Sequence, residues 1–344
     1  MQTASKTAKA AAGLDKARGA LYGLFIGDAL AMPVHWYYDR QALLRDYGRV
    51  AHYRAPRPHH PDSILWRSRY KARHPRGEIL HDKAPFWGRR HVHYHQFLKA
   101  GENTLNLQLV RQLMRSLAAK GAYRPKDYLA RYIDFMTTPG RHRDTYIEEC
   151  HRHFFDNYAR GRAPEKCGRN EKHIGGLSGI VPIIAFYRNR PARGREAAQV
   201  HLSLTHPGPR MAAAADLIMD LILPVIAGVP LQQAILEAID AQKTPLVGHS
   251  FRKWLTLPDE TVVGRYLSPA CYVEDAIPAV VYLALKYHAD PEEMLVVNTN
   301  LGGDNAGRGA ILGALAGAAG GIGAFPSPWI QGLVEPPPDL SGPS

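Results

Sequence analysis

The stretch GGDNAGRGAILGALAGAAGG, residues 302–321, decides the fold class. It opens as a glycine-rich turn with one acid, Asp304, and one amide, Asn305, and continues as a run of small apolar residues. Such a run favours a helix that is apolar nearly all round, which is stable only in a protein interior. A buried helix that begins with a carboxylate marks a candidate site. The alternative is that Asp304 and Asn305 are ordinary N-caps, because both residue types favour that position.

Helical periodicity extends outward from this stretch. LDKARGALYGLFIGDAL from Leu14 and LNLQLVRQLMRSL from Leu105 place apolar residues at helical spacing. Further periodic runs follow, separated by short Pro/Gly segments, and strand-like alternation is scarce. We predict an all-α fold: one compact domain of about ten helices over residues 14–333. A flexible tail (1–13) would precede it and a Pro-rich tail (334–344) would follow it.

The composition limits the cellular compartment and the classes of binding partner that we expect. The 344 residues carry a formal charge of +12, which favours a polyanionic partner or serves solubility alone. The three cysteines, Cys150, Cys167 and Cys271, are odd in number and widely spaced. This spacing argues against a disulfide framework and a zinc site, and favours a reducing, cytoplasmic compartment. No apolar run reaches the roughly 18 residues that span a bilayer, so we expect no membrane partner.

Residues 50–100 depart from the helical pattern. They are dense in Pro, Arg, His and aromatic residues, and a long irregular stretch inside a compact domain is usually functional or disordered. Their aromatic residues argue against disorder. His91, His93 and His95 alternate, so an extended segment would place them on one face. We favour a solvated strand there over a metal site.

Three segments resemble the ADP-ribosylglycohydrolase family, which includes the dinitrogenase-reductase-activating glycohydrolase. They are GALYGLFIGDALAMPVHWYYD (19–39), LSLTHPGPRMAAAA (202–215) and EDAIPAVVYLAL (274–285) with NTNLGGDNAGRGAILGALAGAAGGIGAFPSPWI (298–330). The resemblance runs in order over about residues 14–333. It implies an all-α fold with a central dinuclear magnesium site. In the family, acidic motifs bind the metals, which orient the ribose hydroxyls and the attacking water.

The chain departs from the family's motifs. Where relatives read GDTDT, it has GDNAG, so Asp304 matches the first acid and Ala306 replaces the second. His35 stands in place of the acid that follows the first helix. For the TDDT motif two alignments are open. The preferred one matches GENT (101–104), and the other pairs TDD with TLN (104–106) and retains no acid.

From these matches we predict three sets of site residues. The catalytic set is His35, Asp304 and Glu102. At most one magnesium ion would be held by Glu102, Asn103, Thr104 and Asp304, because Mg²⁺ prefers oxygen ligands. Substrate would be bound by Asp28, Gly302, Gly303, Asn305 and Arg308. Arg141, His142, Asp144 and His151 lie in a segment that matches no family motif and form a further candidate substrate site.

The resemblance predicts a hydrolase of an N- or O-glycosidic ribosyl linkage in an ADP-ribosyl or nucleoside-like substrate. Such a reaction passes through an oxocarbenium-like transition state, with His35 as a base near neutral pH. Two alternatives stay open. One is an inactive protein that binds ADP-ribose or a nucleotide, and the less favoured one is a basic module that binds nucleic acid or protein. Fold alone cannot decide among them.

Overall fold

A computed structural model describes residues 2–340, with side chains from residue 11 onward. Its regular secondary structure is helical, and its described residues form only isolated β-bridges. The all-α prediction is confirmed. The α-helices are α1 (Gln2–Ala31), α2 (Arg40–Tyr47), α3 (Leu105–Lys120), α4 (Pro125–Thr137), α5 (Glu149–Ala159), α6 (Ile180–Phe186), α7 (Pro191–Thr205), α8 (Pro209–Ile226), α9 (Leu231–Ala241), α10 (Phe251–Trp254), α11 (Asp259–Thr261), α12 (Val273–Lys286), α13 (Pro291–Asn300), α14 (Asn305–Gly320) and α15 (Ser327–Gln331).

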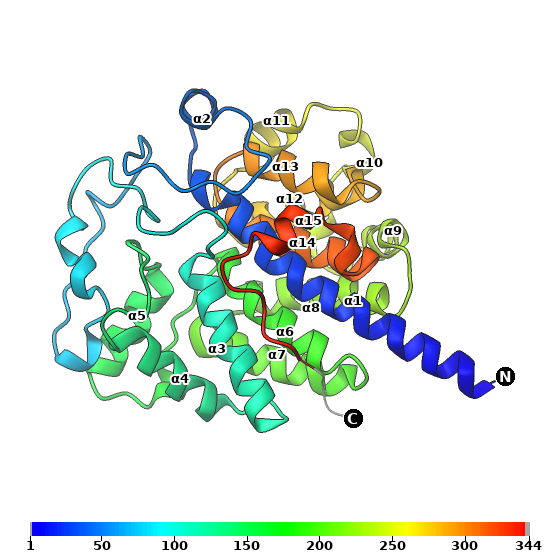
Figure 1. Cartoon of the computed structure of the whole chain (residues 1–344), viewed down its shortest axis with the longest axis horizontal. Coiled ribbons are helices and arrows are strands. Elements are labelled where there is room, and N and C mark those ends of the chain that lie inside the picture. Colours follow the sequence, from blue (N-terminus) through cyan, green and yellow to red (C-terminus); the bar gives the residue numbers. More distant parts are fainter. Residues whose placement is uncertain (1, 341–344) are drawn as a thin grey trace.

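Helices α1 and α14 form the antiparallel centre of the domain (Figure 1). Glycines at every fourth position of α1 lie against glycines of α14, so the two backbones touch directly. A Cβ atom added at Gly23 would lie 1.9 Å from the carbonyl oxygen of Gly313, and one at Gly27 would lie 1.9 Å from that of Gly309. The Gly/Ala-rich composition of both helices is therefore a requirement of their contact.

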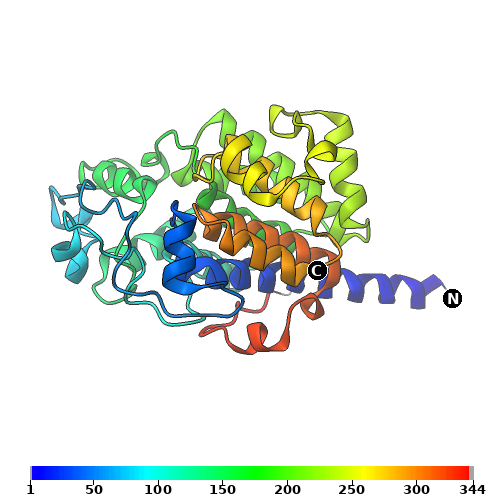
Figure 2. The ribbon, with the colours of Figure 1, turned by 90° about the horizontal axis from the view of Figure 1, so that it is seen from above.

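The remaining helices enclose this pair. Helices α6, α8, α12 and α13 contact α1 or α14, as the view from above also shows (Figure 2). All residues of α14 from Asn305 to Ala318 are buried. Helix α14 begins where Asp304 caps it: the carboxylate accepts a hydrogen bond from the Gly307 amide at 3.0 Å. The capping interpretation of Asp304 is thus confirmed, and it leaves the second carboxylate oxygen free for other partners.

Residues 50–100 form an irregular lobe beside the helices, with short 3₁₀ turns at Pro75–Gly77 and His81–Phe86 (Figure 1). The expectation of a solvated strand is wrong for two of its three histidines. His93 and His95 are buried, whereas His91 is exposed. His93 Nε2 lies 3.0 Å from the Pro33 carbonyl oxygen. This lobe therefore packs on the turn that follows α1.

Both predicted tails contain ordered structure. Helix α1 begins at Gln2, so residues 2–13, expected to be a flexible tail, continue the first helix. Of the Pro-rich segment, residues 334–340 lie along the domain, where the Val334 amide donates to the Gly101 carbonyl oxygen at 3.0 Å and Leu340 is buried. Residues 341–344 lie outside the described part. Between residues 2 and 340, no helix combines the length and the apolar character needed to cross a membrane.

Candidate functional site

Two turns meet at the amino end of α14. The Trp36 amide donates to the Gly303 carbonyl at 2.7 Å, and the Gly303 amide donates to the Tyr37 carbonyl at 2.6 Å. Gly302 and Gly303 have φ of 69° and 63°, and a Cβ atom on Gly302 would lie 2.2 Å from the Tyr37 carbonyl oxygen. Only glycine allows this approach. It carries His35 next to Asp304.

Four buried side chains form a continuous hydrogen-bonded chain at this meeting point. His35 Nε2 lies 3.0 Å from Asp304 Oδ1, and His35 Nδ1 lies 2.8 Å from His95 Nε2. His95 Nδ1 lies 2.5 Å from Asp144 Oδ1, whose other oxygen accepts the Leu105 amide at 2.7 Å. The order is Asp304–His35–His95–Asp144. It joins the first turn, the irregular lobe, the segment before α5 and the start of α14.

The three hydrogen-bonded contacts determine how many protons this chain can accommodate. Each of its three contacts needs one hydrogen, because a carboxylate and an unprotonated ring nitrogen only accept. Two neutral imidazoles supply two protons, and both would be used toward the carboxylates, leaving two lone pairs facing each other at the 2.8 Å contact between the rings. A third proton shared along the chain would satisfy all three contacts.

Burial and the neighbouring groups act in opposite directions on the pKa values of Asp304 and His35. Burial raises the pKa of Asp304, but the hydrogen bond and charge of His35, with Arg308 and the Gly307 amide, outweigh burial and bring the pKa below its usual range. Burial lowers the pKa of His35, and Asp304 opposes that shift. Asp304 is therefore a carboxylate at neutral pH. Both ring nitrogens of His35 are occupied, so His35 orients and polarises Asp304 and has no free nitrogen with which to act as the base.

Glu148 is the second ionisable group at this point. It is partly exposed, and its Oε1 accepts a hydrogen bond from Asn106 Nδ2 at 2.7 Å. Burial, with the negative charge of Asp304, raises the pKa of Glu148 to about 7. Two acids whose pKa values are driven in opposite directions are the usual arrangement of an acid and a base. Glu148 can hold a proton at the pH at which Asp304 is ionised.

A cleft opens beside Glu148, which forms part of its lining. It has a volume of about 270 Å³ and an aromatic lining of Trp36, Tyr38, Tyr94, Tyr146 and Tyr272. Its polar lining is Arg67, Glu148, Glu149 and His173. A smaller hollow of about 10 Å³ lies between His35, His95, Asn106 and Glu148, which is room for about one water molecule. Trp36, Tyr146 and Glu148 line both spaces, so the hollow adjoins the cleft.

Trp36 holds an unusual conformation at the boundary of the two spaces. Its φ of 64° is in the left-handed region, which is uncommon for a bulky residue and costs of order 1–3 kcal/mol. Its ring stacks on His35 with centroids 3.9 Å apart and meets the edges of Tyr94 and Tyr146. The strained turn thus sets an aromatic wall directly over the buried chain.

Most of the predicted substrate-binding residues act inside the fold. Arg308 is fully buried and donates to Asn298 Oδ1, the Pro269 carbonyl and the Gly302 carbonyl at 3.1, 2.9 and 2.6 Å. Asn305 Nδ2 donates to the carbonyls of Val34 and Thr299. These contacts hold the glycine turn in shape. Arg308 and Asn305, with Gly302 and Gly303, therefore build the frame of the site, and of their side-chain polar atoms only Asn305 Oδ1 is buried without a hydrogen-bond partner among the described residues.

Asp28 is buried beneath the start of α3. Its carboxylate accepts hydrogen bonds from Asn103 Nδ2 at 2.9 Å, the Thr104 amide at 2.9 Å and Thr104 Oγ1 at 2.6 Å. Burial raises the pKa of Asp28 to about 6 against the effect of these hydrogen bonds. Asp28, Asn103 and Thr104, predicted to bind substrate or metal, instead tie α1 to α3.

Asp28→Ala should lower the free energy of unfolding by about 3 kcal/mol or more, because three buried donors would lose their acceptor. Denaturant titration followed by circular dichroism measures this. Asp339→Ala is the control, since within the described part of the chain Asp339 forms only an exposed ion pair with Arg18, and its loss should cost less than about 0.5 kcal/mol. Equal losses in the two variants would contradict the role of Asp28.

Glu102 points away from Asp304. It forms a bidentate ion pair with Arg143 and lines a different cavity, together with Asn103. Thr104, Leu105 and Asn106 line the hollow beside His35 and Glu148 instead. The structure therefore favours the second alignment, in which TLN occupies the place of the family's TDD. The preferred alignment fails because the chain turns at Thr104, the N-cap of α3, and this turn separates residues 102–103 from the site.

The residues around Asp304 do not match a pair of magnesium ions. Mg²⁺ takes oxygen ligands in near-octahedral geometry, whereas the positions that correspond to family acids hold His35, Leu105, Asn106 and Ala306. Among the described residues, no group of three or more His, Cys, Asp or Glu side chains is arranged to hold a metal. The donor set thus offers the isolated oxygens of Asp304, Asn106 and Glu148 and nothing that bridges two cations.

Known proteins share both sequence features and the fold of this chain. The family model described as ADP-ribosylglycohydrolase matches residues 9–341. The chain belongs to the ADP-ribosylglycohydrolase family. A solved structure titled "ADP-ribosylglycohydrolase-related protein complex" superposes with a TM-score of 0.62 at 23% identity, covering 93% of each chain, which supports the shared fold. None of the curated proteins compared matches the chain.

Three functional groups of this ADP-ribosylglycohydrolase family member escaped the motif comparison. His95 was considered only as part of an alternating triple, Asp144 only within an unmatched segment, and Glu148 was not singled out. The available signal was composition: residues 141–153 contain several histidines and acids close together. Their use depends on folding, because His35 and His95 are 60 residues apart and His95 and Asp144 are 49 apart.

Proposed function

We propose that this protein hydrolyses a glycosidic bond to ribose in an ADP-ribosyl or nucleoside-like substrate without a dinuclear magnesium centre. Family membership supports glycohydrolase chemistry. The observation that carries the proposal is a pair of acids with opposite pKa shifts: Glu148, which lines the cleft and has a raised pKa, and the buried Asp304, which is kept ionised through His35. General acid and base groups of this kind are what glycoside hydrolysis requires.

The cleft suits the two ends of such a substrate. Its tyrosines and Trp36 offer faces and edges for a ribose or a base. Arg67 is exposed, and its guanidinium has no hydrogen bond or ion pair to another described residue, so it is available to a phosphate. Burial lowers the pKa of His173, but Cys271 and Glu171 raise it by more, and the net upward shift makes His173 a second cation.

The reaction then needs two proton transfers. Glu148 donates its proton to the leaving atom as the bond to the ribose C1 breaks, and positive charge develops on the sugar. A water molecule adds to C1, and Asp304 takes the proton that this water loses. His35, held by His95 and Asp144, acts as a positioning residue that keeps the Asp304 carboxylate oriented and negatively charged beside the oxocarbenium-like transition state.

A binding-only protein is the second candidate. Leu105 and Ala306 stand where the family motifs carry acids, and neither side chain can bind a metal or move a proton. A cleft with these replacements could still hold ADP-ribose through its aromatic wall and Arg67. The two candidates differ in whether Glu148 and Asp304 act on the bound ligand.

Turnover assays distinguish them. Wild-type protein should release ADP-ribose from ADP-ribosyl-arginine or ADP-ribosyl-serine, or free base from a nucleoside, at the same rate in Mg²⁺ and in EDTA. Calorimetry should find at most one magnesium ion per chain. Binding of ADP-ribose without turnover of any of these substrates would establish the binding-only candidate. Two tight magnesium sites, or activity abolished by EDTA, would overturn the proposed metal-independent mechanism.

A further inference from the structure

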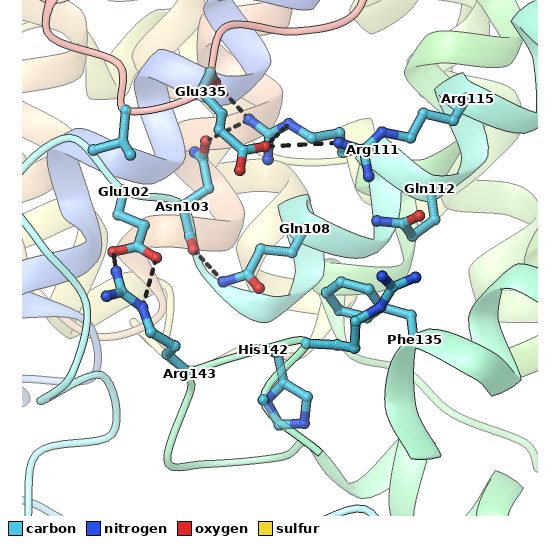
Figure 3. Close-up of a pocket in the computed structure, with 13 residues that line it drawn as sticks. Glu102, Asn103, Gln108, Arg111, Gln112, Arg115, Phe135, His142, Arg143 and Glu335 are labelled. Carbon is cyan, nitrogen blue, oxygen red and sulfur yellow. Dashed lines mark hydrogen bonds and ion pairs between the residues drawn. The ribbon is translucent and has the colours of Figure 1, made fainter. Parts of the chain in front are cut away.

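A second cavity is lined by Glu102 and Asn103, two residues just before α3 (Figure 3). Its volume is about 380 Å³, and it shares no lining residue with the cleft or the hollow. It is formed by one face of α3, by residues 140–143 and by the start of the C-terminal segment at residues 334–335. His35, Glu148 and Asp304, the groups of the proposed mechanism, do not line it.

The lining of this cavity is strongly cationic. Arg111 and Arg115 come from α3, and Arg141 and Arg143 come from the loop before α5. Glu102 and Glu335 are its only acidic lining residues in the described part of the chain. Two amide side chains, Gln108 and Gln112, add donors. Four guanidinium groups facing one space repel one another, so the cavity gains stability from an anion.

Arg111 is fixed in place before any ligand arrives. It is buried, and its guanidinium lies 4.7 Å from the centre of the Phe25 ring. Its Nη2 donates to the Glu335 carbonyl oxygen, and its Nε lies 3.1 Å from Glu335 Oε2. Burial lowers the pKa of Arg111 against the effect of Glu335. A buried guanidinium held in one orientation is a preorganised site for an oxyanion.

The other arginines are available to a ligand at low cost. Arg115 is half exposed and lies 4.0 Å from Glu335, at the limit of an ion pair. Arg141 pairs with Asp134 at 3.1 Å, where both side chains are more than half exposed. Exposed pairs of this kind contribute little stability, so they break readily when a stronger acceptor is present. Arg143 is held more firmly by Glu102.

Glu335 already occupies the cavity as an internal anion. It belongs to the C-terminal segment that Val334 anchors to Gly101, and its side chain is 61% exposed at the edge of the space (Figure 3). One carboxylate has two oxygens, whereas Arg111 and Arg115 together present more donors than it can accept. An anion with more oxygens would satisfy them better.

We propose that this cavity is a second ligand site, which takes the diphosphate or triphosphate group of a small molecule and in which Glu335 competes with that ligand. Phosphate oxygens match the forked donors of arginine, and a diphosphate spans two such forks. Arg111 provides the fixed contact, Arg115 and Arg141 close on the ligand, and Glu335 leaves the space. The site is separate from the hydrolytic cleft, so it binds whether or not the proposed hydrolysis occurs.

Calorimetric titration with inorganic pyrophosphate at low salt tests the proposal. Arg115→Gln and Arg141→Gln should each weaken binding on the order of tenfold, because each removes a charge-assisted contact. Glu335→Gln should strengthen binding several-fold. Added salt should weaken binding in the wild type. Arg131→Gln is the matched control, since Arg131 lies on the neighbouring helix α4 and, among the described residues, forms an ion pair only with Asp127.

The variant Arg67→Gln distinguishes binding in the cleft from binding in the second cavity, because it removes the arginine that lines the cleft. If Arg67→Gln abolishes binding while Arg115→Gln and Arg141→Gln leave it unchanged, pyrophosphate occupies the cleft and the second site is disproved. Absence of binding at millimolar pyrophosphate also overturns it. If Glu335→Gln does not strengthen binding, Glu335 is not a competitor and that half of the proposal fails.

Discussion

Gly313→Ala is expected to leave no folded protein. The added Cβ atom would lie 1.9 Å from the carbonyl oxygen of Gly23 and 2.6 Å from its carbonyl carbon. Both atoms are backbone atoms of a helix, so no rotamer change relieves the overlap, and α1 and α14 would have to separate. Overpacking in a core that can adjust costs about 1–3 kcal/mol, and this contact cannot adjust locally. The loss should therefore approach the whole stability of a domain, about 5–15 kcal/mol.

Gly13→Ala provides the control on α1 itself. Its Cβ atom would meet only the Ile226 carbonyl oxygen at 3.9 Å, an ordinary contact. Replacing a glycine inside a helix by alanine should stabilise the protein by about 0.5–1 kcal/mol. Expression, circular dichroism and thermal unfolding compare the two variants. A folded Gly313→Ala protein with a melting temperature near that of the wild type would disprove the direct backbone contact of α1 and α14.

Glu148→Gln is expected to reduce turnover by about 10²–10⁴-fold while the fold is retained. The amide has the shape of the carboxyl group and can still accept the hydrogen bond of Asn106, but it has no proton to give to the leaving atom. Substrate binding should change little, so the effect should fall on kcat and leave KM nearly constant. Glu149→Gln is the control, because Glu149 also borders the cleft but is exposed.

The pH dependence of wild-type activity also tests Glu148 as the general acid. The pKa of Glu148 is raised to about 7, so the proton that it donates is present below that pH and lost above it. Activity should fall as the pH rises through about 7, and this alkaline limb should be missing from the residual activity of Glu148→Gln. An unchanged profile in the variant would remove Glu148 from the role of general acid.

The sequence predicted the fold well because its signals are local. Apolar spacing of 3.6 residues specifies the buried face of α3, and the nearly continuous small and apolar residues of α14 indicate a helix that is buried all round, as the structure shows. The family motifs located Asp304 and His35 for the same reason, since each lies in a contiguous stretch next to a helix end. The prediction for Glu102 failed because a shift of three residues in the alignment is invisible in the sequence and decides whether a side chain lines the hollow beside His35 or the other cavity.

The sequence by itself therefore determined the all-α class, the family, the capped start of α14 and the small residues that α1 and α14 require. Only the tertiary structure decided the site. His95, Asp144 and Glu148 reach His35 and Asp304 from segments far apart in the chain. The pKa values of His35, Glu148 and Asp304 depend on burial and on charges that folding brings near. Helix formation is encoded by neighbours in the chain, whereas a buried proton network is encoded by neighbours in space, which no local pattern reveals.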